Sequence, residues 1–150
     1  MPYRICKTFD IESAHMLSKH PGKCKYPHGH SRKVEVVLRA TGLDGADMVC
    51  DFKAVKLAIG EFIQSFDHAI CVNSGDPQLP ALQSMAGARI ITFERQDPTS
   101  EVMAKHMFDF IKEALRREFS KSGNYQIGVQ VQLERVRLWE TKSSWAEYSE

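Results

Sequence analysis

The chain has 150 residues, of which 43% are hydrophobic and 26% charged, and its formal net charge is +1. This length predicts one compact domain, residues 1–150, with a core large enough to fold without disulfides. The charge balance argues against a general nucleic-acid binder, which needs a basic excess to neutralise phosphates. No apolar run approaches the length of a membrane span, so we expect neither nucleic acid nor membrane as a partner.

The cysteines favour a reducing compartment. Cys6, Cys24, Cys50 and Cys71 are scattered along the chain and form no CxxC pair. The first residues, Met1–Arg4, do not begin a signal peptide, so we expect a cytoplasmic protein with free thiols. Three of the four, Cys6, Cys50 and Cys71, are interpreted as buried small hydrophobes.

Two strands and a helix are predicted in the first half of the chain. Apolar residues of one parity predict a strand over Tyr3–Phe9. A β-branched run predicts a second strand within Ser31–Thr41. Apolar residues at helical spacing predict a helix between Lys53 and Phe66, with Asp51 as its N-cap.

The next segment, Cys71–Asp97, is long for a connection in a compact domain. Its one sign of order is Ala88–Phe93, which is consistent with an edge strand. A second helix is predicted over Val102–Leu115, because helical periodicity there follows the start signal Asp97-Pro98-Thr99.

The C-terminal part returns to strands. Gln126–Glu140 alternates, and a shift of the apolar parity near Val136 predicts a bulge. Trp145–Tyr148 is consistent with a last short strand. Together the elements predict an α+β fold, an antiparallel four-stranded sheet with two helices on one face.

A metal site is indicated by His28-Gly29-His30, which opens the second predicted strand. Side chains two apart on a strand share a face, and His15, after the first strand, would lie beside them if the chain returns as a hairpin. Three neutral imidazoles leave a fourth position open, as in a catalytic zinc site. Two alternatives remain: ordinary polar histidines, or a closed structural site in which Cys24 supplies the fourth ligand.

Cys24 lies between Lys23 and Lys25, and nearby cations favour the reactive thiolate. The alternative is that Cys24 is a buried small hydrophobe like the other cysteines, but the neighbours of Cys24 in the sequence are not those of a core residue. From Ser13 to Val34 the chain carries several basic residues and no acidic one. This imbalance indicates an anionic ligand such as phosphate, or else a solvated basic loop.

Two further groups carry carboxylates. Asp67-His68 directly follows the first predicted helix, where a carboxylate can fix an imidazole tautomer, although helix capping explains the pair equally well. Glu140 ends the third strand, and its carboxylate could accept two hydrogen bonds from a planar donor such as a pterin ring edge. The alternative for Glu140 is an exposed strand-end residue.

These motifs together resemble the 6-pyruvoyl-tetrahydropterin synthase family, and within it the bacterial 6-carboxy-tetrahydropterin synthases. The similar stretches occur in the same order nearly from end to end of the chain. They are Phe9-Asp10-Ile11-Glu12-Ser13-Ala14-His15, Cys24-Lys25-Tyr26-Pro27-His28-Gly29-His30, Met48-Val49-Cys50-Asp51-Phe52, Phe66-Asp67-His68, Pro98-Thr99-Ser100-Glu101 and Trp139-Glu140-Thr141.

The resemblance implies roles for these residues. It implies that the three histidines bind Zn²⁺ and that Cys24 is the catalytic thiol. It implies that Asp67 and His68 work with that thiol in proton transfer, and that Glu140 anchors the pterin. The residues expected near the same ring are Thr99, Ser100 and Glu101.

The resemblance also implies the substrate and the assembly. The family substrate is 7,8-dihydroneopterin triphosphate, and we expect Lys23 and Lys25 to contact its phosphates. The implied fold is the tunnelling fold, or T-fold, in which subunit sheets join into a β-barrel. We therefore expect a homo-oligomer, a trimer or a dimer of trimers, with active sites between subunits.

The spacing of Cys24 and His28 matches the carboxy-forming branch. It favours conversion of the substrate to 6-carboxy-5,6,7,8-tetrahydropterin with release of acetaldehyde and triphosphate, a step of queuosine biosynthesis. The alternatives are the pyruvoyl-forming synthase, which keeps the side chain intact, a retro-aldol lyase, and a non-catalytic zinc-stabilised pterin-binding module.

Overall fold

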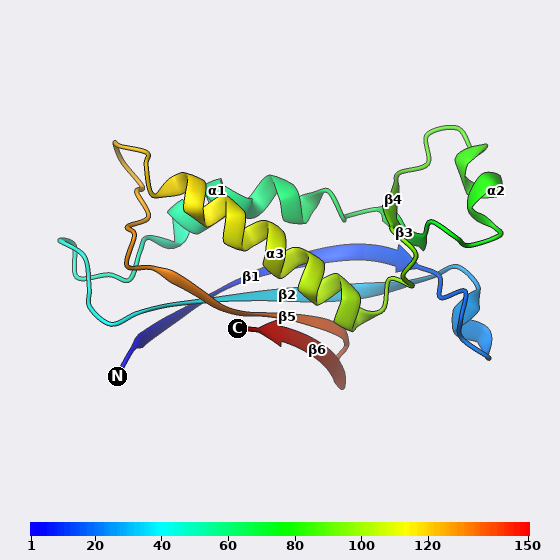
Figure 1. Cartoon of the computed structure of the whole chain (residues 1–150), viewed down its shortest axis with the longest axis horizontal. Helices are drawn as coiled ribbons and strands as arrows, with labels where there is room; N and C mark the ends of the chain where they lie inside the picture. Colours follow the sequence, from blue (N-terminus) through cyan, green and yellow to red (C-terminus); the bar gives the residue numbers. More distant parts are fainter.

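The computed structural model describes all 150 residues. It consists of one six-stranded sheet in the order β4-β3-β1-β2-β5-β6, with helices packed against it (Figure 1). The strands are β1 (Tyr3–His15), β2 (His28–Ala40), β3 (Ala69–Asn73), β4 (Ile90–Phe93), β5 (Gln132–Thr141) and β6 (Ser144–Ser149). The helices are η1 (Lys23–Lys25, a 3-10 turn), α1 (Phe52–Gln64), α2 (Leu79–Gln83) and α3 (Ser100–Glu118).

The sheet is mixed, which corrects the prediction of four antiparallel strands. β1, β2, β5 and β6 pair antiparallel, as expected. β3 pairs parallel to β1, and β4 pairs parallel to β3. β4 confirms the edge strand predicted in Ala88–Phe93. β3 was not predicted, because five residues after a helix are too few to show a period.

The two long helices pack on one face of the sheet (Figure 1). Asp51 caps α1 by accepting from the backbone N–H of Lys53, and Thr99 caps α3 by accepting from that of Val102. The predicted N-cap of α1 is therefore confirmed, and the start signal before α3 is explained. The core of 26 buried residues joins this face to the strands; Val34 and Val36 of β2 are completely buried.

Two strand limits differ from the prediction. β1 runs to His15, six residues beyond Phe9, since the alternation continues through polar residues. β5 begins at Gln132, and residues 126–131 lie outside any strand. The predicted bulge is present: Val37 pairs with Arg135 and Leu38 with Leu133, which leaves Glu134 without a partner. The last strand is also present as β6.

Cysteine burial agrees with the prediction at two positions of three. Cys50 and Cys71 are buried, and Cys24 is partly exposed. Cys6 is exposed, so its interpretation as a core residue was wrong. It has the opposite parity to Ile5 and Phe9 on β1, and its side chain therefore faces away from the helices.

No helix combines the length and the apolar character needed to cross a bilayer.

Candidate metal centre and active site

Three histidines converge at the end of the β1–β2 hairpin. The antiparallel register pairs His15 with His28 and Ser13 with His30, so the alternation of β2 directs both of its histidines to the helix-covered face. The ring centroids lie 4.5, 5.2 and 5.0 Å apart, and one nitrogen from each ring lies within 4.8 Å of the others. The arrangement expected from the sequence is therefore present within one chain.

Backbone carbonyls orient two of the rings. Nδ1 of His15 lies 2.8 Å from the carbonyl oxygen of Pro98, and Nδ1 of His28 lies 2.8 Å from that of Tyr26. A carbonyl only accepts, so each Nδ1 carries the hydrogen and each Nε2 keeps a free lone pair. Nε2 of His30 is buried and has no hydrogen-bond partner. This is the tautomer and outer-shell pattern typical of metal-ligating histidines.

The surroundings also favour the neutral form of two of the imidazoles, His15 and His30. Burial lowers the pKa of His15 to about 4, against the hydrogen bond to Pro98 that raises it, and the Arg32 charge lowers it further. Burial, followed by the Arg32 charge, lowers the pKa of His30 as well. A neutral imidazole is the form that binds a metal, so these residues could hold one near neutral pH.

Cys24 lies in η1, on the loop that joins β1 to β2, and its thiol is not part of the convergent set. The loop is tied back to the body of the protein by Asp97, a buried residue just before α3. Its carboxylate accepts from the Ser18 hydroxyl at 2.7 Å, the Lys19 backbone N–H at 2.7 Å and the Asn73 amide at 3.0 Å. From the sequence, Asp97 was interpreted only as part of a helix start.

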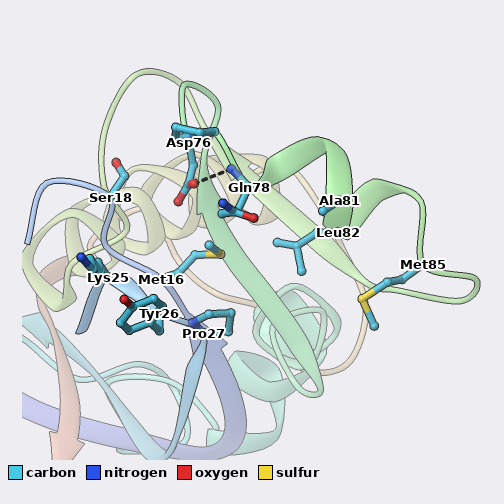
Figure 2. Close-up of a pocket in the computed structure, with 11 residues that line it drawn as sticks. Met16, Ser18, Lys25, Tyr26, Pro27, Asp76, Gln78, Ala81, Leu82 and Met85 are labelled. Atoms are coloured by element: carbon cyan, nitrogen blue, oxygen red, sulfur yellow. Dashed lines mark hydrogen bonds between the residues drawn. The ribbon is translucent and has the colours of Figure 1, made fainter. Parts of the chain in front are cut away.

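A cavity of about 550 Å³ separates this loop from α2 (Figure 2). Lys25 and Tyr26 face it from one side, and Leu82 and Met85 face it from the other. Lys25 lies with its ammonium 5.1 Å from the centre of the Tyr26 ring. Lys23 is exposed on the same turn. Both lysines expected to meet phosphate are thus free of carboxylate partners.

The Asp67–His68 hydrogen bond is formed as predicted, but the pair lies outside the cluster of His15, His28 and His30. Oδ2 of Asp67 accepts from Nδ1 of His68 at 2.7 Å, and Oδ1 accepts from the backbone N–H of Glu12 at 2.7 Å. The hydrogen bond from Glu12, followed by that from His68, lowers the pKa of the Asp67 carboxyl. The His68 side chain is 74% exposed. The chain does not bring this pair into its own histidine cluster.

Glu140 does reach the cluster, from the end of β5. Its Oε1 lies 3.5 Å from Nε2 of His15 and 3.5 Å from Nε2 of His30. The Ser100 hydroxyl donates to the same oxygen at 3.4 Å. The strand-end glutamate is therefore part of the site rather than a solvent-exposed residue.

Of the other residues expected near the pterin, Thr99 and Ser100 lie at the start of α3 next to the cluster, and Glu101 lies elsewhere. Thr99 is occupied as the cap of α3, directly beside Ser100. Glu101 is exposed and lines a different cavity, together with Lys105 and His106. Within one chain, the structure therefore does not place Glu101 at the histidine cluster.

Arg32 also lies at the histidine cluster, although the sequence analysis did not predict it as a site residue. It follows His30 by two positions and is 1% exposed. Its Nη2 lies 3.2 Å from Nδ1 and 3.4 Å from Nε2 of His15, so the guanidinium packs against that ring. From the sequence it counted only as one of the basic residues in a segment interpreted either as binding an anionic ligand or as a solvated loop.

Comparisons of the sequence with known proteins give matches over nearly the whole chain. The family model described as 6-pyruvoyl tetrahydropterin synthase matches residues 4–150. The chain is 34% identical to a 6-carboxy-5,6,7,8-tetrahydropterin synthase of Aquifex aeolicus, over 100% of this chain and 99% of the relative. It is 28% identical to a protein of the same name from Haemophilus influenzae, over 99% of each.

The fold is similar to that of solved structures at low identity. The 6-pyruvoyltetrahydropterin synthase of Plasmodium vivax superposes with a TM-score of 0.72 at 14% identity, covering 100% of this chain and 98% of that one. The Caenorhabditis elegans 6-pyruvoyl tetrahydropterin synthase gives 0.66 at 20% identity, covering 100% and 96%. Both matches extend over the whole sheet and its helices.

Proposed function

Because the chain belongs to the 6-pyruvoyl tetrahydropterin synthase family, we propose that it converts 7,8-dihydroneopterin triphosphate and water to 6-carboxy-5,6,7,8-tetrahydropterin, acetaldehyde and triphosphate. The observation that carries the proposal is the convergence of one ring nitrogen from each of three imidazoles, within 4.8 Å of one another. The full-length relatives named for the carboxy-forming reaction support this product. The same relationship supports a role in making the deazapurine queuosine.

The metal of this site would be Zn²⁺, held by His15, His28 and His30. The donor set fits that ion, since three neutral imidazoles and one open position form a catalytic zinc site. When bound, zinc would act as a Lewis acid toward the hydroxyl groups of the substrate side chain.

The remaining residues would bind and orient the substrate and move protons. The Cys24 thiolate would transfer a proton at the substrate side chain. Glu140 would accept two N–H groups from the pterin ring and so hold the side chain over the metal. Lys23 and Lys25 would bind the triphosphate of the substrate through charge attraction. The triphosphate would leave by elimination, which needs no nucleophile on phosphorus. Ser100, which donates to Glu140, would complete the ring's surroundings together with the adjoining Thr99.

We also propose that Asp67 and His68 act at the site of a neighbouring copy, in a trimer or a dimer of trimers. The exposure of His68 supports this, because a proton relay must be accessible to the substrate and His68 is not part of the histidine cluster of its own chain. The ends of the sheet, β4 and β6, are unpaired edges through which subunits could join into a barrel.

Product analysis tests the proposal. The zinc-loaded protein is incubated with 7,8-dihydroneopterin triphosphate, and acetaldehyde, triphosphate and the pterin are measured separately. We expect all three products in equal amounts. Triphosphate without aldehyde would show a pyruvoyl-forming synthase, and aldehyde without triphosphate would show a retro-aldol lyase.

Chelation separates an enzyme from a zinc-stabilised binding module. For a catalytic metal, removal of zinc should abolish turnover while the protein stays folded, and adding zinc back should restore turnover. A protein that unfolds on chelation and turns over no substrate when loaded would instead be a binding module.

A further inference from the structure

The loop that carries Cys24, residues 16–27 between β1 and β2, is closed by its own backbone hydrogen bonds. The Leu17 N–H donates to the Cys24 carbonyl at 3.0 Å, and the His20 N–H donates to the Leu17 carbonyl at 3.0 Å. These bonds join the backbone of Cys24 to the first residues of the Cys24 loop. A contact that fixes those first residues therefore also fixes the backbone that carries the thiol.

That contact comes from Asp97, on the segment before α3. Asp97 is 7% exposed, and its carboxylate accepts from the Ser18 hydroxyl and the Lys19 backbone N–H, each at 2.7 Å. Asn73 of β3 donates to the same carboxylate at 3.0 Å. Burial raises the pKa of the Asp97 carboxyl, but the hydrogen bonds, that of Ser18 first, lower it more. The carboxylate is therefore charged near neutral pH, and hydrogen bonds to a charged acceptor are about twice as strong as neutral ones.

The next residue in the chain orients a proposed metal ligand. The Pro98 carbonyl accepts from Nδ1 of His15 at 2.8 Å. The Thr99 N–H donates to the Asp97 carbonyl at 2.8 Å, and Thr99 caps α3, so this stretch of backbone is itself fixed to a long helix. The Cys24 loop and one of the histidines are therefore held by two adjacent residues at the start of α3.

We propose that Asp97 is a positioning residue, which holds the Cys24 thiol in a fixed place relative to the metal bound by the three histidines. The inference rests on the proposed function, since it takes the metal and the role of the thiol from there. It gives a function to a buried charge whose side-chain hydrogen bonds go only to the Cys24 loop and to β3. A reacting group that is displaced by about 1 Å can lose about 100-fold in rate, so a loop that carries one needs an anchor.

The test measures the rate at which iodoacetamide alkylates Cys24 as a function of pH, with and without one equivalent of Zn²⁺. A nearby metal ion favours the thiolate, so in the wild type Zn²⁺ should lower the pH of half-maximal alkylation by about one unit or more. In Asp97→Ala the loop is free to move away from the metal, and this zinc-dependent shift should be lost. Cys6 is the internal reference, because it is exposed on the face of the sheet opposite the long helices and should respond neither to Zn²⁺ nor to the substitution.

Turnover gives an independent measurement. Asp97→Ala should lower kcat about 10- to 100-fold because the thiol is misplaced. The values of KM and of the zinc dissociation constant should stay near those of the wild type, since the metal ligands stand on β1 and β2. A residue that only stabilised the fold would affect all of these together. Asp97→Asn keeps one oxygen acceptor and should have an intermediate kcat.

Asp76→Ala is the matched control. Asp76 is likewise a buried acidic residue, 5% exposed, but its carboxylate accepts from the Gln78 backbone N–H and not from the Cys24 loop. This variant should keep both the zinc-dependent shift and the wild-type kcat. If Asp97→Ala fails to fold, Ser18→Ala removes one of the two hydrogen bonds to the loop and should reduce the shift by a smaller amount.

The outcomes separate this inference from the proposed function. A folded Asp97→Ala protein that keeps either the wild-type zinc shift or the wild-type kcat would overturn the role of Asp97 alone. If Zn²⁺ does not shift the alkylation of Cys24 in the wild type, the thiol is not beside the metal and the inference falls, whereas formation of the three products would still establish the reaction. A zinc-loaded wild type that forms none of the products would overturn the proposed function, and with it the catalytic meaning of the anchor.

Discussion

The histidine cluster and the Asp67–His68 pair both adjoin the last residues of β1, and they differ in how much of their surroundings the chain supplies. His15 is completely buried, its ring is oriented by Pro98, and two partner histidines face it. His68 is 74% exposed, and Asp67 is its one side-chain partner. The first group has its orienting partners within the chain and is buried, whereas the second is oriented by Asp67 but is open to solvent.

The difference shows what each group requires. A metal site needs ligands fixed within a fraction of an ångström, and a hairpin register with carbonyl hydrogen bonds provides this locally. A proton relay needs only one oriented imidazole that a substrate can approach. Asp67 supplies the orientation through its two hydrogen bonds, to His68 and to the backbone of Glu12. We therefore expect the two groups to meet only across a subunit boundary.

The largest expected effect concerns the two proposed proton-transfer residues, Cys24 and His68, which we expect to act together from different subunits. Cys24→Ala and His68→Ala should each lower turnover about 10²- to 10⁴-fold, since each removes a proton-transfer group. Assemblies that mix the two variants equally should recover about a quarter of wild-type activity, because that fraction of sites combines an intact thiol with an intact imidazole from different copies. Co-expressed chains with different tags, purified in two steps, allow the measurement.

Two observations would contradict this prediction. Mixed assemblies that stay inactive would place the thiol and the imidazole in the same chain, as would an active monomer seen by light scattering. Cys50→Ala is the matched control, because Cys50 is a buried thiol 3% exposed in the core. If it lost as much activity as Cys24→Ala, the assignment of the catalytic thiol would be wrong.

The burial of the cluster predicts a pH dependence of stability in the metal-free protein. The pKa of His15 is lowered to about 4 when folded, against about 6.5 when unfolded, so the unfolded chain binds more protons between these values. The free energy of unfolding should therefore decrease as the pH falls from 6.5 to 4, by up to about 3 kcal/mol from this residue. Above pH 6.5 this contribution is fully present.

Denaturant titrations in the presence of a chelator measure this dependence. His15→Gln cannot take up the proton, so its unfolding free energy should vary less between pH 7 and pH 4 than that of the wild type. The lowered pKa values of His30 and Asp67 contribute to both proteins and cancel in the comparison of slopes. Equal slopes would show that the imidazole is protonated in the folded protein.

The convergence of His15, His28 and His30 could be predicted because strand alternation and a hairpin register are local rules. His28 and His30 share a parity, and only His15 depended on where β1 ends. The sequence could not predict that Arg32 is buried, since a basic residue on a strand is usually exposed and its counter-ion, Glu140, is 108 positions away in sequence and on β5. Asp97 was missed for the same reason: its partners on the Cys24 loop and on β3 are distant in sequence.

The smallest expected effect concerns the basic turn beside the cluster. Lys25 faces the cavity in Figure 2 and has no carboxylate partner, so its ammonium is free for a phosphate. Lys25→Ala should raise KM for the triphosphate substrate about fivefold, because one exposed charge pair contributes up to about 1 kcal/mol. The value of kcat should change little, since the contact is the same in ground and transition states.

Two controls test whether the effect on KM comes from the Lys25 charge itself: the dependence on ionic strength and the variant Lys33→Ala. The difference in KM should shrink as ionic strength rises, because exposed charges are screened. Lys33 belongs to the same basic segment but is exposed on the face of β2 opposite the histidines, so Lys33→Ala should leave KM nearly unchanged. If both variants raised KM equally, the overall charge of the segment would attract the substrate, and Lys25 would have no particular contact with its phosphates.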